Sequence, residues 1–236
     1  MSNTVRLFHF TCDHWAAENV KNRRLKLSFP NDVNDIFEFM PFDFGDSEKA
    51  RSFRTAWKTA IDGYSKSQGF ISFSESWAVP TMWGHYANNH KGVCLGFDLP
   101  IRRGESIAYA DKIRYIDKLR PISERDLADT KYKDQLVNFA RMTKSNHWSY
   151  EEEWRYWFSL SQTEKELKLT KPNEVFFANF DANLVLREVI FGARSTHTTE
   201  SFKTLLRETD DVKFTTARPS FRRFAMVTQQ LASLNK

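Results

Sequence analysis

The chain has 236 residues and a formal net charge of +5, and 41% of its residues are hydrophobic and 15% aromatic. This apolar content excludes an intrinsically disordered chain, and no run approaches the roughly 20 apolar residues that a membrane span requires. Because the first residues lack the apolar run of a secretory signal peptide, we expect a cytoplasmic protein with no membrane partner.

The predicted secondary structure changes irregularly between short strands and helices. Alternating or β-prone segments predict strands at residues 6–11, 24–28, 70–74, 93–98, 112–116, 154–160, 175–177, 188–191 and 212–216. Helices are predicted at residues 13–22 with Asp13 as the cap, 47–66, 80–88 with Pro80 in the first turn, 124–145 and 201–208. Residues 29–37 are dense in turn formers and predict a loop.

This order of elements lacks regular β-α-β alternation, which excludes a doubly wound parallel sheet. We expect a single α+β domain over residues 1–236, with mixed, largely antiparallel sheets and helices packed around them.

Signatures of glycine-rich phosphate loops, zinc proteases and serine hydrolases are absent from the sequence. The six histidines are scattered, and His85 and His90 are five residues apart, which takes them off a common helix face. Cys12 and Cys94 form no ligand cluster and are too few for a disulfide framework, so we expect reduced thiols that pack in the protein. No metal site is predicted.

Three consecutive glutamates stand directly before a predicted strand in the aromatic segment WSYEEEWRY, residues 148–156. Strand alternation would place Glu151 and Glu153 on one side and Glu152 on the other. A carboxylate held among rings loses solvation, so its charge interacts strongly with a nearby cation. The pattern suits a glutamate that stabilises a sugar cation. The alternative is a solvated acidic turn with Arg155 as its counter-ion.

Two other segments combine polar and aromatic side chains. His9 lies on the first predicted strand between Phe8 and Phe10 and points away from both, either as a core histidine bonded to backbone or as a ligand-binding residue. Residues 80–98 gather Trp83, Tyr86 and several histidines and asparagines in a short span. Core packing accounts for the two large rings but less readily for the clustered His and Asn side chains.

The carboxyl-terminal segment is basic, because residues 213–236 contain five Lys or Arg and no acid. It also carries Phe214, Phe221 and Phe224, and a basic segment with aromatic residues favours a polyanionic partner. The alternatives are a solvated face, or arginines that pair with Asp210 and Asp211 and dock the segment.

The segments RLFHFT, MWGHYANNHKGVCLGFD, YEEEWRY and EVIFGAR resemble a widespread bacterial family of unknown function, over about residues 6–195. A more remote similarity is to the ADP-ribosyltransferase superfamily, especially its DNA-modifying toxin branch. Those proteins open with a strand that carries a His near an aromatic residue. Their catalytic Glu stands at the start of a later strand and is followed by an aromatic residue. The similarity implies an ADP-ribosyltransferase-like fold that uses NAD as substrate.

The same resemblance implies roles for individual residues. Glu153 would stabilise the sugar cation, and Glu151 would position or deprotonate the acceptor. The residues implied to bind NAD are His9, Phe10, Thr11, Trp83, His85 and Tyr86. A nucleic-acid acceptor, DNA or RNA, would be held by Arg218, Arg222 and Arg223. A toxin or phage-defence effector with an antitoxin or immunity protein as partner is also implied, and the alternatives are an NAD glycohydrolase and a non-catalytic nucleic-acid-binding module.

Overall fold

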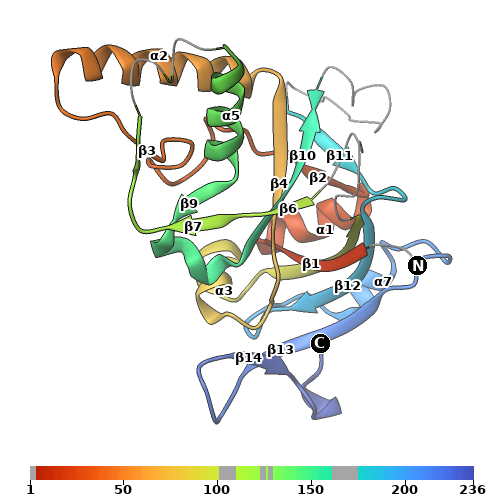
Figure 1. Cartoon of the computed structure of the whole chain (residues 1–236). Helices are drawn as coiled ribbons and strands as arrows, with labels where there is room; N and C mark the ends of the chain where they lie inside the picture. Colours follow the sequence, from red (N-terminus) through yellow and green to blue (C-terminus); the bar gives the residue numbers. More distant parts are fainter. Residues whose placement is uncertain (1–3, 101–109, 123–125, 127–129, 161–174) are drawn as a thin grey trace.

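A computed structural model of the chain describes residues 4–100, 110–122, 126, 130–160 and 175–236 (Figure 1). Its centre is an eight-stranded sheet in the order β14-β13-β12-β5-β1-β4-β10-β6. Every neighbouring pair in it is antiparallel except β12 with β13. The strands are β1 (Thr4–Thr11), β4 (Gln68–Ser74), β5 (Val93–Pro100), β6 (Ala110–Lys112), β10 (Glu153–Ser159), β12 (Val185–Phe191), β13 (Lys213–Pro219) and β14 (Met226–Thr228). The predicted mixed, largely antiparallel α+β architecture is thereby confirmed.

Three two-stranded sheets accompany the large one. They pair β2 (Arg24–Lys26) with β11 (Phe177–Asn179), β3 (Phe42–Asp43) with β8 (Arg120–Pro121), and β7 (Arg114–Ile116) with β9 (Thr143–Ser145). The prediction of a single strand at residues 112–116 is wrong, because these residues belong to two separate strands, β6 and β7. The division falls at Ile113, whose N–H donates to the carbonyl of Glu153 at 2.9 Å. Before this residue β6 pairs with β10, and after it β7 pairs with β9.

The helices follow the local signals at most of their starts. They are α1 (Asp13–Lys21), α2 (Glu48–Ser65), α3 (Pro80–Tyr86), α5 (Thr130–Arg141) and α7 (Thr199–Lys203), with short 3₁₀ helices η1 (Asn146–Glu151) and η3 (Ala232–Leu234). Ser47, the first residue of the helix predicted over 47–66, instead caps α2 by accepting from the N–H of Ala50. Pro80 stands in the first turn of α3, as predicted. Asp13 is not a cap: Cys12 holds that position, and the Asp13 carboxylate accepts from Asn88 instead.

Two predictions fail near the site and at the carboxyl terminus. The helix predicted over residues 124–145 ends at Arg141, and the chain continues into β9; residues 124, 125 and 127–129 of that prediction lie outside the described part. The strand predicted at 212–216 is not the last one. It extends to Pro219 and returns as β14, so the basic segment begins as a β-hairpin of the main sheet.

The two faces of the sheet carry different cores. One face holds a large core in which Leu7, Phe97 and Tyr156 pack with residues of α1, β2, β11 and α7. On the other face, α3 covers a smaller core around Phe10. A third core around Trp157 lies beneath α2 and α5, which Figure 1 shows together at the end of the molecule away from the β13–β14 hairpin.

The sheet opens between β1 and β4. These strands pair only at Phe8 and Ser74. Beyond that point the Nδ1 atom of His9 lies 3.0 Å from the carbonyl oxygen of Ser72. Near the start of β4, Phe70 exchanges two backbone hydrogen bonds with Ser28 instead. The His9 side chain and the backbone of Ser28 therefore occupy hydrogen-bonding positions of β4 that β1 would fill in a continuous β1–β4 ladder.

Candidate functional site

A cavity of about 330 Å³ lies at this opening. Its walls come from β1, β4, α3, the end of β2 with residues 28–38 of the loop after it, β9, and the acidic turn that leads into β10. The volume is near the lower end of the range for small-molecule sites, which runs from about 300 to 1,000 Å³.

Three glutamates and two cations meet at one wall of the cavity. The Nζ atom of Lys144 lies 2.5 Å from Glu151 Oε2, 3.2 Å from Glu153 Oε2 and 3.7 Å from Glu38 Oε2. Arg155 pairs with Glu153 at 2.7 Å through Nε and with Glu38 through Nη2. These five side chains, called here the charged cluster, are buried, and their formal charges sum to one negative charge when all five are ionised. Such a wall favours a positively charged group.

Glu153 is held by four donors at the start of β10. Its Oε1 accepts from Ser72 Oγ and from Arg155 Nε, both at 2.7 Å, and its Oε2 accepts from Lys144 and from Arg155 Nη2. The carboxylate is therefore fixed before any ligand binds. Arg155 is the counter-ion that the alternative interpretation named, but the turn is not solvated, because Glu151 and Glu153 are each 3% exposed.

Glu151 and Glu153 face the same side, as predicted, but by a different backbone path. Glu151 ends η1, Glu152 adopts a left-handed conformation with φ of 44°, and the strand begins at Glu153. Both neighbours of Glu152 can therefore reach Lys144. The Tyr86 hydroxyl donates to Glu151 Oε1 at 2.5 Å, which ties α3 to the acidic turn.

Burial and mutual repulsion govern the protonation of the charged cluster. Burial raises the pKa of Glu153 above its usual range, and the charge of Glu151 adds to this effect while Lys144 opposes it. Burial acts to lower the pKa of Lys144, but the charges of Glu153 and Glu151 outweigh it and raise the pKa overall. Burial lowers the pKa of Arg155 to about 9, so the guanidinium stays charged at neutral pH.

His9 reaches the same cavity from the opposite side of the opening. Burial lowers its pKa, although its bond to the Ser72 carbonyl opposes this, so the ring is neutral at pH 7. Because a carbonyl oxygen only accepts, Nδ1 carries the hydrogen and Nε2 is an acceptor. His9 and Glu153 both contact Ser72, the first through its carbonyl and the second through its hydroxyl. The two predicted site residues thus converge on one residue of β4.

The other residues implied to bind NAD divide into two groups. Phe10 and Tyr86 line the cavity together with His9. Trp83 does not line it: this ring is fully buried against Phe10 and donates from Nε1 to the Trp77 carbonyl at 2.6 Å. Thr11 lies at the end of β1, and the exposed His85 has its Nδ1 3.5 Å from the Tyr150 hydroxyl. Neither of them contributes to the cavity wall.

Sequence reasoning missed Lys144, Glu38 and Ser72. The helix predicted over residues 124–145 includes Lys144, and Glu38 directly follows the loop that turn formers predict at residues 29–37. Glu38 and Ser72 have partners far away in the chain, since Glu38 pairs with Arg155 and Ser72 with Glu153. Glu151 and Glu153, the partners of Lys144, are close in the chain but lie beyond η1. A Lys next to a polar residue at the end of a predicted helix gives no local signal of burial.

The three basic-segment arginines are far from the charged cluster. Arg222 and Arg223 are exposed in the turn of the β13–β14 hairpin, and Arg218 lies on β13 with its guanidinium carbon 4.8 Å from the centre of the Phe221 ring. Among the residues that the structure describes, none of the three makes an ion pair. Asp210 and Asp211, the acids expected as alternative partners, pair with Arg23 and Arg187.

Several features bear on other classes of site. Cys12 and Cys94 are free thiols, as expected, and burial raises the pKa of Cys94. Within the described ranges, no group of three or more His, Cys, Asp or Glu residues is arranged to hold a metal ion. No described helix combines the length and the apolar composition needed to cross a membrane.

The fold and site define an α+β protein with a cavity, walled on one side by the charged cluster, where its main sheet opens. Residues 82–156 match a family described as "Protein of unknown function (DUF2971)", in agreement with the resemblance noted from the sequence. The matched segment runs from α3 into β10 and includes Tyr86, Lys144 and the acidic turn. Searches of curated proteins and of solved structures each give no match.

Proposed function

We propose that the protein is an NAD-dependent ADP-ribosyltransferase that modifies nucleic acid. The observation that carries the proposal is the meeting of Glu151, Glu153, Tyr86 and His9 at one cavity whose charged wall has an excess of negative charge. Cleavage of the bond between nicotinamide and ribose develops positive charge on the sugar. Fixed carboxylates in a water-poor site stabilise such charge.

In this mechanism the nicotinamide leaves with the bonding electron pair as a neutral ring. Glu153, fixed by its four donors, stabilises the ribosyl cation. The acceptor then attacks the anomeric carbon and loses a proton to Glu151. The Nε2 atom of His9 accepts from a ribose hydroxyl and orients the substrate. Because the cavity is small, the adenosine half of NAD extends toward its opening.

The choice of nucleic acid as the acceptor rests on the basic β13–β14 hairpin. Arg222 and Arg223 lie on its exposed turn and form no ion pair with any residue that the structure describes. Such arginines attract phosphates, and the resulting affinity depends on salt. The resemblance to the toxin branch extends the proposal to a toxin or phage-defence effector that is held in check by an antitoxin or immunity protein.

The test is incubation with NAD labelled in its adenylate part together with DNA, RNA and protein, followed by identification of the labelled product. We expect label on nucleic acid, and a loss of about 100- to 1,000-fold in rate for Glu153→Gln. That variant leaves two carboxylates facing two cations, so we expect it to fold. Glu152→Gln is the matched control, because Glu152 does not line the cavity.

The products also separate the alternatives. Label released as free ADP-ribose with every acceptor would identify an NAD glycohydrolase at the same site. Unchanged NAD after prolonged incubation, together with binding of nucleic acid, would identify a non-catalytic binding module. Near-normal turnover of a folded Glu153→Gln protein would refute the catalytic assignment.

A further inference from the structure

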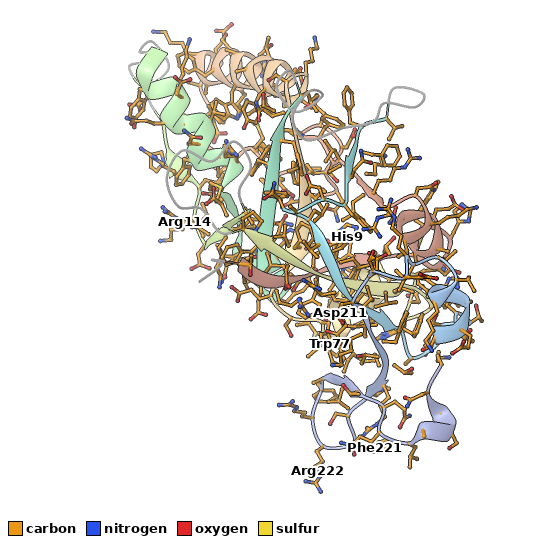
Figure 2. The ribbon with its side chains drawn as sticks, turned by 90° about the vertical axis from the view of Figure 1, so that its right-hand side faces the viewer. His9, Trp77, Arg114, Asp211, Phe221 and Arg222 are labelled. Atoms are coloured by element: carbon orange, nitrogen blue, oxygen red, sulfur yellow. The ribbon has the colours of Figure 1, made fainter. Side chains whose placement is uncertain are left out.

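The tip of the β13–β14 hairpin, residues 219–225, presents two phenylalanine rings to solvent. Phe221 is 90% exposed and Phe224 is fully exposed. Figure 2 shows Phe221 and Arg222 on the hairpin that projects away from His9 and from the body of the sheet. The proposed catalytic cavity uses none of these residues.

The tip is held by its own backbone and by a buried anchor. Ser220 donates to the carbonyl of Ala225, and Ala225 donates to that of Arg223, both at 2.9 Å. Met226, directly after the tip, is 2% exposed and donates from its N–H to the carbonyl of Ala78 at 2.8 Å. The rings are therefore displayed on an anchored support.

Positively charged arginines lie next to the two exposed rings. Arg222 and Arg223 lie between Phe221 and Phe224 in the chain, and the Arg218 guanidinium lies over the Phe221 ring. Residues 213–236 contain no acid that could neutralise them. A partner of complementary chemistry must offer both negative charge and flat apolar faces. A nucleic-acid strand with unpaired bases offers both in each nucleotide, whereas a duplex hides the faces of its bases.

We propose that the hairpin tip binds single-stranded nucleic acid, with bases stacked on Phe221 and Phe224 and phosphates against Arg222 and Arg223. This inference rests on the proposed function, which names nucleic acid as the acceptor, and it adds that the acceptor is single-stranded. A lipid surface fits less well, since inserting the two rings would carry the guanidinium groups between them toward the apolar layer at high cost.

The experiment measures binding of the full chain to fluorescein-labelled oligonucleotides by anisotropy, without NAD, using one mixed sequence as a single strand and as a duplex. We expect the wild type to favour the single strand. Replacing both rings in Phe221→Leu/Phe224→Leu should weaken single-strand binding by about 10-fold or more, because each stacked base contributes substantially. Duplex binding, which depends on phosphates, should change little.

Two controls keep the outcome clear. Arg51→Gln/Lys58→Gln removes two charges from exposed positions of α2, far from the hairpin, and should bind as the wild type does. Melting temperatures of all variants should agree, because the replaced rings are exposed. Unchanged single-strand affinity in the Leu variant would overturn the inference. If the wild type binds vesicles containing phosphatidylserine and the Leu variant does not, while both bind the oligonucleotide equally, the inference is overturned in favour of a membrane surface.

The inference and the proposed function can fail separately. If the wild type transfers label from NAD but the Leu variant binds single strands normally, only the role of the rings is refuted. If single-strand binding depends on the rings but NAD is never consumed, the proposed reaction is refuted and the hairpin assignment stands.

Discussion

At the scale of single residues, Lys144 is the central cation of the charged cluster. Its ammonium group contacts all three glutamates, and Arg155 contacts two of them. Removal of one partner from a buried group of charges leaves the others uncompensated, which costs more than the group contributes when it is complete.

We predict that Lys144→Met lowers the free energy of unfolding by about 3 to 5 kcal/mol at pH 7. The three remaining carboxylates can be relieved by taking up protons, so the loss should be smaller at pH 5. Urea unfolding at both pH values measures the effect. Adding Glu151→Gln to this variant removes one excess charge and should recover part of the lost stability. A loss below about 1 kcal/mol, or one independent of pH, would show that Lys144 does not hold the cluster.

The pH dependence of NAD cleavage should report Glu153. Burial raises its pKa and the Glu151 charge raises it further, so activity should fall as the pH drops through a value above that of an ordinary glutamate. In Glu151→Gln the repulsive charge is gone, the pKa of Glu153 falls, and the acidic limb should move to lower pH. The measurement is the single-turnover rate of nicotinamide release against pH, a step that precedes the proton transfer to Glu151, with Glu152→Gln as the control whose limb stays in place. A limb that moves to higher pH contradicts this coupling.

At the scale of elements, the turn between α3 and β5 explains much of the MWGHYANNHKGVCLGFD motif. Asn88, Asn89 and His90 all have left-handed backbone, with φ of 44°, 53° and 70°. After this turn, Gly92 packs against the end of β1, where an added Cβ would lie 2.2 Å from the carbonyl oxygen of Thr11. The clustered asparagines therefore serve backbone geometry, and only Tyr86 of the motif's polar side chains meets the charged cluster.

We predict that Gly92→Ala lowers the free energy of unfolding by about 3 kcal/mol, because its new methyl group would meet backbone atoms that cannot move aside. The matched control is Gly84→Ala in α3, where an added Cβ meets nothing within 4 Å. That change should raise stability by about 0.5 to 1 kcal/mol, as Ala favours helix more than Gly does. Chemical denaturation compares the two, and equal effects would contradict the close approach.

At the scale of the whole molecule, the cavity and the basic hairpin are separate features. The cavity lies where β1 and β4 part, and the hairpin extends the far edge of the same sheet beyond β12. Figure 1 shows the hairpin projecting from the body at the end opposite to α2 and α5. Under the proposed function, the hairpin would hold a long acceptor while one of its nucleotides enters the cavity.

We predict that replacing Arg218, Arg222 and Arg223 together with Gln weakens nucleic-acid binding regardless of sequence. Loss of about three phosphate contacts should flatten the plot of log affinity against log salt by about 2 to 3 units. The melting temperature should stay unchanged, because Asp210 and Asp211 pair with other arginines. Anisotropy titrations at several salt concentrations test this, and an unchanged slope would remove the physical reason for naming nucleic acid.

Local sequence rules were sufficient where a segment's own residues decide its structure. The helical pattern of residues 47–66 indicated α2, Pro80 indicated the start of α3, and the apolar run 93–98 indicated β5. The acidic turn could also be singled out, since three glutamates among rings are conspicuous in any fold. These features depend on hydrogen bonds and side-chain preferences that span only a few residues.

Tertiary structure alone decided the composition of the site. Lys144 became its central cation because α5 ends at Arg141 and β9 pairs with β7. Glu38 joined it through Arg155, and Ser72 linked His9 to Glu153, although all of these partners are distant in the chain. The physical reason is that a charge in a low-dielectric interior must be balanced by whichever groups the fold brings within a few ångströms. Local patterns show which residues can carry charge, but only the packed chain determines which of them are buried together.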